Sequence, residues 1–246
     1  GEDECEGYAE VPAYDATSQR AFVVNAEDSS VDIIDMSTPS MPTLHYRLVI
    51  SNGEPNSVAV SSNGLVGVAV AVDPKQDNGL AMFFDTDGTL VGSITAGALP
   101  DMITFTNDGT KALVANEGEP DDDYVVDPVG SVTVIDVSDT TSLTATQVGF
   151  TSFNSQMATL EANGVRIFGP GATVAQDLEP EYIAVAGDDS TATIVMQENN
   201  AVATLDLSTN TITGIHALGF KDYSTLSLDL SDKDGGVNFQ SWDNVK

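Results

Sequence analysis

The sequence predicts an all-β fold, a β-propeller of four-stranded antiparallel blades. One motif recurs about four times along the chain, its strands are rich in Val, Ile and Thr, and Asn-Gly or Asp-Gly turns separate them. Radial repetition of four-stranded units of roughly 40–50 residues is typical of propellers. We expect about four blades in this chain, as part of a larger ring of about seven.

The third unit shows the motif most clearly. A lead-in containing Pro100 and Asp101 precedes an apolar strand at 102–105, and a turn at 107–109 connects it to a second strand at 112–116. A gap follows, and then a third strand at 131–136 that closes on Asp136. Tight turns between alternating apolar runs favour antiparallel hairpins.

The closing aspartates of the four units set the period of the repeat. They fall at positions 35, 85, 136 and 206, so the steps are 50, 51 and 70 residues. Fourth strands are expected at 90–94, 146–150 and 212–216. The sequence therefore predicts units near 9–52, 53–97, 98–150 and 178–222, in a single propeller domain that spans 1–246.

The long third step indicates an insertion at 151–177. Phe153, Met157 and Leu160 have helical spacing and Gly164 follows them, which predicts a short amphipathic helix with a glycine stop.

The charge balance is strongly acidic. The 246 residues include 8 Lys plus Arg and 38 Asp plus Glu, a formal net charge of −30. This excludes nucleic acid and anionic membrane surfaces as natural partners, because both are bound through cations. The chain contains no apolar run of the roughly 18 residues that a membrane span needs. Cys5 is the only cysteine, so no disulfide forms within the chain and the partner of Cys5 stays open.

Several segments carry a family resemblance. Residues 115–124, 126–131, 164–182, 197–200 and 218–222 resemble motifs of the bacterial choice-of-anchor I proteins, which look related to mesenchyme-specific cell surface glycoprotein-like sequences. The resemblance implies a propeller that is secreted, periplasmic or attached to the cell surface. It also implies that this chain is the N-terminal portion of a longer protein. No catalytic residues come with the resemblance.

The strand order predicts where the acidic residues gather. In a four-stranded meander, the lead-in and the second connection lie on one face of the disc, and the first and third turns lie on the other. The lead-ins and second connections here are rich in Asp and Glu. We therefore predict an acidic face with these candidate metal ligands: Glu117, Glu119, Asp121, Asp122, Asp123, Asp127, Glu179, Glu181 and Glu198.

Calcium is the cofactor that this face predicts. Two unit charges 4 Å apart repel by about 1 kcal/mol in water, so crowded carboxylates favour a bridging cation. Calcium takes six to eight oxygen ligands, which Asp and Glu supply. Asp232 and Asp234 form a second candidate, because 231–236 resembles the opening of a calcium loop. A solvated acidic surface without a metal is the alternative.

Three functions follow from these observations. The first is an extracellular calcium-stabilised propeller that acts as a binding or scaffold module for a glycan, an envelope component or a protein. The second is a calcium-dependent phosphohydrolase of the alkaline phosphatase or phytase kind, and the third is a metal-dependent lactonase-like hydrolase. His45 and His216 are the only histidines and support no catalytic triad. The sequence assigns no catalytic residues, so whether the protein is an enzyme stays open.

Overall fold

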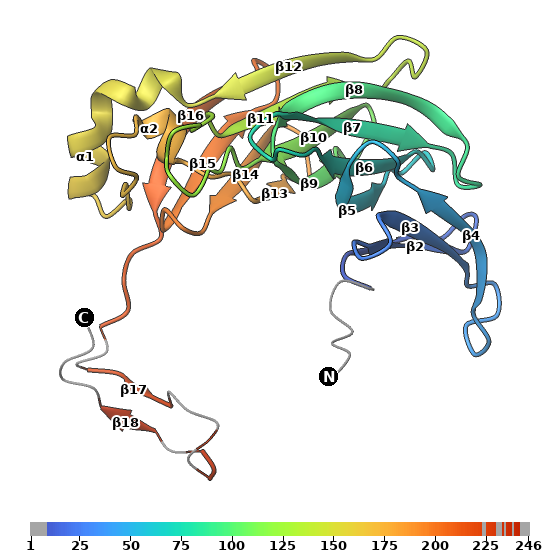
Figure 1. The fold of residues 1–246 in the computed structure, drawn as a ribbon, viewed down its shortest axis with the longest axis horizontal. Helices are drawn as coiled ribbons and strands as arrows, with labels where there is room; N and C mark the ends of the chain where they lie inside the picture. Colours follow the sequence, from blue (N-terminus) through green and yellow to red (C-terminus); the bar gives the residue numbers. More distant parts are fainter. Residues whose placement is uncertain (1–8, 223–224, 230–232, 234, 238, 242–246) are drawn as a thin grey trace.

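The computed structural model describes residues 9–222, 225–229, 233, 235–237 and 239–241. The predicted fold class is confirmed, because these residues form four four-stranded antiparallel sheets in which sequential strands are neighbours. The sheets fan out side by side in an open arc (Figure 1). The chain thus covers four propeller blades.

Each blade is a meander. Blade 1 contains β1 (Pro12–Asp15), β2 (Arg20–Asn25), β3 (Ser30–Asp35) and β4 (Thr43–Val49). Blade 2 contains β5 (Glu54–Val60), β6 (Val66–Ala71), β7 (Asn78–Phe84) and β8 (Leu90–Ala98). Blade 3 contains β9 (Pro100–Phe105), β10 (Lys111–Asn116), β11 (Ser131–Asp136) and β12 (Thr144–Gly149). Blade 4 contains β13 (Tyr182–Val185), β14 (Thr191–Met196), β15 (Ala201–Asp206) and β16 (Thr211–Ala217).

The insertion between blades 3 and 4 is helical, as its spacing predicts. It begins as a 3-10 helix, η1 (Thr151–Gln156), continues as α1 (Met157–Ala162) and ends with α2 (Val174–Asp177). Phe153 and Leu160 are buried in the same apolar cluster as blades 3 and 4. After blade 4, the short strands β17 (Ser227–Leu228) and β18 (Gln240–Ser241) pair with each other.

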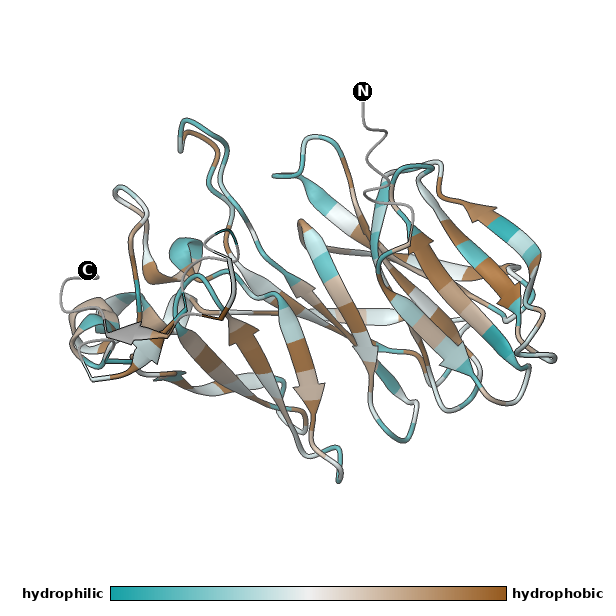
Figure 2. Cartoon of the chain, turned by 90° about the horizontal axis from the view of Figure 1, so that it is seen from below, coloured by the Kyte–Doolittle hydropathy of each residue, from teal (hydrophilic) through white to brown (hydrophobic). Residues whose placement is uncertain are grey.

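The core lies between the blades rather than within one sheet. Three apolar clusters fill the spaces between blades 1 and 2, 2 and 3, and 3 and 4. The inner strands are therefore apolar on both faces, and every residue of β6 is buried. Figure 2 shows apolar residues along the strands and polar residues mainly in the loops and turns.

The meander gives the disc two different faces. The lead-in to the first strand and the connection from second to third strand lie on one side, which we call the pocket face. The first and third turns of each blade lie on the other side, which we call the turn face. Among the described residues, no helix is both long and apolar enough to cross a membrane.

Candidate functional site

A pocket of about 490 Å³ opens on the pocket face between blades 3 and 4. Side chains from both blades line it, and six of them are carboxylates. The lining residues are Asp101, Glu117, Glu119, Pro120, Tyr124, Phe168, Glu179, Glu181, Gln197 and Glu198. None of the described lining residues is Lys, Arg or His.

Close approach of two backbones brings the two acidic segments together. A Cβ atom on Gly130, just before β11, would lie 1.8 Å from the carbonyl oxygen of Leu178 and 2.7 Å from Pro180. Only glycine fits there, so the lead-in to blade 4 packs directly against blade 3. Glu179 in this lead-in therefore shares a pocket with Glu117, which follows β10.

The aromatic wall of the pocket is fixed by a buried carboxylate. Asp177 accepts hydrogen bonds from the backbone N–H groups of Phe168, at 2.9 Å, and Gly169. The amide of Asn199, which is fully buried, donates to Asp177 as well. The guanidinium of Arg166 lies 4.3 Å from the centre of the Phe168 ring, a distance typical of cation–π contacts. Phe168 is thereby held at the edge of the pocket.

Crowding and burial change the acidity of the pocket. Burial raises the pKa of Glu117 to about 8, and repulsion from Asp101, Glu119 and Glu179 adds to the effect. Burial also raises the pKa of Glu179 to about 7, with repulsion from Glu198 as the next cause.

Glu181 and Asp101 shift in the same direction. The pKa of Glu181 rises to about 8, first through burial and then through a hydrogen bond and repulsion with Glu198. Burial raises the pKa of Asp101. Without a cation, the pocket therefore keeps protons on several carboxyl groups at neutral pH.

Five of the candidate ligands predicted from sequence meet in this pocket: Glu117, Glu119, Glu179, Glu181 and Glu198. Asp127 lies beside it, in a small adjoining cavity that Asp177 and Glu179 also line. The Asp121 carboxylate accepts the N–H of Val125 at 2.7 Å and closes its own loop.

The remaining candidates lie elsewhere. Asp122 and Asp123 are exposed and do not line the pocket. Asp232 and Asp234 are outside the described residues.

Two kinds of pocket residue are absent from the predicted ligand set. Asp101 belongs to the lead-in pattern that predicted the acidic face, so its place on this face was predictable from the sequence. Phe168 and Tyr124 come from the insertion and from the loop after β10, and no periodicity marks them. Their role follows only from the fold.

A second pocket of about 600 Å³ lies on the same face of blade 2. Its lining includes Glu54, Asn56, Asp73 and Lys75. The ammonium of Lys75 binds the Glu119 carboxylate at 2.5 Å, and Gln76 donates to the Glu119 carbonyl. This ion pair links the two pockets.

The carboxylates of the first pocket do not form a closed coordination shell. Among the described residues, no three His, Cys, Asp or Glu side chains are grouped as a metal ion requires. The pocket as it stands is an open, partly protonated acidic cavity.

Comparison with known proteins decides the family. The sequence model of the choice-of-anchor I domain matches residues 10–246. The chain belongs to the choice-of-anchor I family. The predicted resemblance is confirmed, and membership supports a propeller module of a cell-surface or secreted protein. No curated protein matches the chain.

Solved structures share the fold at low sequence identity. The chain is similar to a chain of the nidogen/laminin complex, with 12% identity, a TM-score of 0.51, and 85% of this chain and 63% of that chain covered. It is also similar to a putative 6-phosphogluconolactonase from Bacteroides uniformis, with 13% identity, a TM-score of 0.55, and 83% and 52% covered. A hydrazine synthase from Kuenenia stuttgartiensis matches with 15% identity, a TM-score of 0.50, and 81% and 65% covered.

The chain thus spans between 52% and 65% of these three proteins. At such identities the likeness shows the propeller fold alone.

Proposed function

We propose that this propeller is a non-catalytic surface or secreted binding module, and that its acidic pocket binds calcium. The observation that carries the proposal is a single cavity lined by six carboxylates from two blades, with no basic side chain among its described lining residues. A cation there joins blades 3 and 4. It also presents a positive centre to a glycan, an envelope component or a protein.

The protonated state of the pocket supports a cation as its partner. Burial and the neighbouring carboxylates raise the pKa values of Glu117 and Glu181 to about 8, so both hold protons near neutral pH. Calcium takes six to eight oxygens at 2.3–2.6 Å, so its binding displaces these protons and draws the carboxylates inward. We expect calcium affinity to increase with pH between about 6 and 9.

Catalysis has weaker support. A phosphohydrolase needs positive charge near the phosphate besides the metal, and none of the described lining residues supplies it. The likeness to a putative lactonase is one of fold. We expect no turnover of p-nitrophenyl phosphate, phytate or simple lactones, with calcium or with EDTA. Calcium-dependent turnover that Glu181→Gln abolishes would show that the protein is an enzyme and not a non-catalytic binding module.

Thermal unfolding with and without calcium tests the proposal. A ligand that binds only the folded state at a hundred times its Kd stabilises it by about 2.7 kcal/mol. We expect calcium to raise the melting temperature and EDTA to reverse the rise. The double variant Glu179→Gln/Glu181→Gln should lose this response.

The matched control removes the same charge outside the pocket. Asp122→Asn/Asp123→Asn changes two exposed carboxylates of the neighbouring loop and should keep the full response. If that control loses the response and the pocket variant keeps it, the calcium site lies in the loop. If millimolar EDTA leaves the melting temperature of the purified protein unchanged and added calcium does too, the calcium proposal is wrong.

A further inference from the structure

The loop that connects β10 to β11 presents apolar side chains to solvent. Val125 is 80% exposed and Val126 51%, and Tyr124 and Phe168 are each 41% exposed. Tyr124 and Phe168 line the same pocket, and a Cβ atom on Gly169 would lie 3.7 Å from Cε1 of the Tyr124 ring, so the four side chains adjoin. We call them the apolar patch. A contiguous exposed patch indicates an interaction site, whereas single exposed apolar residues need no explanation.

Hydrogen bonds within the loop hold the patch in place. The backbone N–H of Asp121 donates to the carbonyl of Val126, and the N–H of Tyr124 donates to the carbonyl of Asp121, both at 2.9 Å. The Asp121 carboxylate accepts the N–H of Val125. Tyr124 has a φ of 53°, a left-handed conformation that is unfavourable for a residue other than glycine. The loop is thus closed on itself while its valine side chains stay in solvent.

Both ends of the loop are tied to other elements. The amide of Gln176 in α2 donates to the carbonyl of Asp127 at 2.9 Å. The amide of Gln76 in blade 2 donates to the carbonyl of Glu119 at 3.2 Å. A loop that is already ordered loses less conformational freedom when a partner docks on it. This anchoring therefore suits the patch to binding.

Carboxylates surround the apolar patch. Residues 117–127 include six Asp or Glu and no Lys or Arg. Asp122 and Asp123 directly precede Tyr124 and are exposed, and Asp127 directly follows Val126. An apolar centre with a polar rim is the usual anatomy of a protein–protein interface. Because the rim is negative, charge complementarity requires a positively charged partner.

A polypeptide is the occupant that fits this chemistry. The valine side chains gain only from apolar contact, and a hydrophilic glycan has little apolar surface to offer them. An anionic membrane would bring its negative surface potential against Asp122 and Asp123. A second copy of this chain carries the same net charge of −30, so long-range repulsion opposes the contact.

We infer that the apolar patch, together with Asp122 and Asp123, docks a basic segment of another protein. Apolar side chains of that segment pack on Val125 and Val126, and its Lys or Arg side chains pair with the two aspartates. This docking rests on the proposed role as a binding module. It does not require calcium, because none of these four residues lines the acidic pocket.

Selection from a library of short random peptides displayed on phage tests the inference. The purified protein is the bait, and the enriched peptides are then synthesised for affinity measurements. We expect these peptides to combine Lys or Arg with apolar residues. Val125→Ser should weaken their binding at least roughly tenfold. Val237→Ser, at a valine that is 81% exposed, is the matched control and should bind like the wild type.

The charged rim gives a second measurement with the same synthetic peptides. Asp122→Asn/Asp123→Asn keeps the shape of both side chains and removes their charge, so it should weaken binding several-fold at low salt. High salt should weaken binding to the wild type and reduce its advantage over this variant, because salt screens exposed charges.

Several outcomes overturn the inference. It is wrong if no peptide is enriched, if the enriched peptides lack Lys and Arg, or if they bind Val125→Ser as tightly as the wild type. Binding to vesicles of phosphatidylcholine and phosphatidylglycerol that Val125→Ser abolishes assigns the patch to a lipid surface. A dimer mass by light scattering that Val125→Ser abolishes assigns it to a second copy.

The calcium response separates this inference from the calcium site. Val125→Ser should lose peptide binding and keep the rise in melting temperature with calcium. Glu179→Gln/Glu181→Gln should lose that rise and keep peptide binding. If the pocket variant loses peptide binding as well, the peptide docks in the acidic pocket and not on the patch.

Discussion

Aspartates on the turn face and glutamates on the pocket face lie in opposite electrostatic environments. On the turn face, an aspartate accepts hydrogen bonds from a Ser or Thr two or three residues later. Asp136, for example, accepts the N–H of Ser138 at 3.0 Å and its hydroxyl at 2.6 Å. Such bonds favour the ionised form. They lower the pKa of Asp15, Asp35, Asp108, Asp136, Asp139, Asp188 and Asp206.

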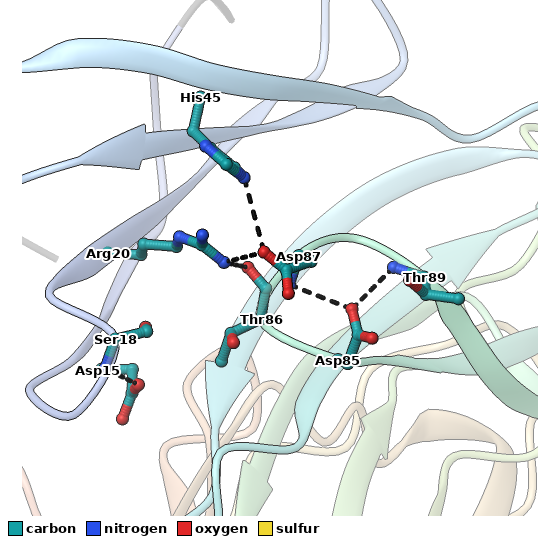
Figure 3. Close-up of polar contacts among 8 residues, drawn as sticks. All are labelled: Asp15, Ser18, Arg20, His45, Asp85, Thr86, Asp87 and Thr89. Carbon is teal, nitrogen blue, oxygen red and sulfur yellow. Dashed lines mark hydrogen bonds and ion pairs between the residues drawn. The ribbon is translucent and has the colours of Figure 1, made fainter.

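The turn face also uses its few cations between blades. Arg20 of blade 1 donates to the Asp87 carboxylate and to the Thr86 carbonyl of blade 2, each at 2.6 Å. Figure 3 shows both contacts. His45 lies 3.6 Å from the same carboxylate. The hydrogen bond and charge of Arg20 lower the pKa of Asp87. Carboxylates on this face are satisfied by the protein itself.

In the acidic pocket between blades 3 and 4, the neighbours of a carboxylate are mostly other carboxylates. Glu117 faces Asp101, Glu119 and Glu179, and its pKa is raised to about 8. The comparison teaches that the net charge of −30 is not one uniform surface property. The turn face neutralises its charges locally, and the acidic pocket between blades 3 and 4 needs protons or an external cation.

The largest expected effect concerns Asp177, a buried pocket-face carboxylate that the protein itself satisfies with hydrogen bonds. Asp177→Ala removes the acceptor of Phe168, Gly169 and Asn199, and leaves the Asn199 amide buried without that partner. We expect a loss of about 3 kcal/mol in the free energy of unfolding, measured by urea denaturation. Asp177→Asn keeps one acceptor oxygen and should lose less. Equal losses in the two variants would mean that the hydrogen bonds to the Asp177 carboxylate do not hold Phe168 and Gly169 in place.

A smaller effect is expected from the turn-face contact between blades 3 and 4. The Asp189 carboxylate accepts the N–H groups of Asn107, at 2.7 Å, and Asp108, at 3.0 Å. Asp189→Ala should cost about 1–2 kcal/mol by the same measurement. Asp188→Ala, at the neighbouring position, removes only the two hydrogen bonds that Ser190 donates within the same turn. If Asp188→Ala lowers the free energy of unfolding more than Asp189→Ala, hydrogen bonds within a turn contribute more to stability than the contact between blades 3 and 4.

The repeat made most of the fold predictable from sequence. The recurring lead-in, turn and closing aspartate located the strands of blades 2, 3 and 4, because each reports local geometry. Blade 1 was harder, since β1 (PAYD) is short and β4 is exposed along most of its length, so neither shows a clear apolar pattern. The helical spacing of Phe153, Met157 and Leu160 was visible, but not that the helix begins in 3-10 form.

The site was predictable only as a set of segments. Topology places Glu117 and the lead-in of Glu179 on one face, and this required no tertiary detail. Which carboxylates meet depends on the close approach at Gly130. The Asp121 carboxylate is used by its own loop, and Phe168 enters the pocket because Asp177 holds it. These are long-range contacts that composition and spacing do not encode.

The final prediction uses pH to separate the two faces. Pocket-face groups such as Glu117 and Glu179 have pKa values of about 8 and 7 in the folded protein, against 4.5 ordinarily. In that interval the folded state binds more protons than the unfolded state. Without calcium, the free energy of unfolding therefore decreases as pH rises from about 5 to 9. Turn-face aspartates have lowered pKa values, so their contribution is lost only as pH falls below about 4.

Two variants assign the two limbs of this profile. Glu117→Gln resembles the protonated side chain, so the free energy of unfolding of this variant should fall less steeply above pH 5. At pH 8 we expect the resulting difference from the wild type to be less than about 1 kcal/mol, because the group is partly solvated. Asp206→Asn should change only the acid limb, since that carboxylate is favoured by Ser208 and Thr209. Calcium should abolish the alkaline decrease in the wild type because it replaces the protons. A profile that stays flat from pH 5 to 9 in EDTA would mean that the pocket carboxylates are ionised and solvated, like exposed ones.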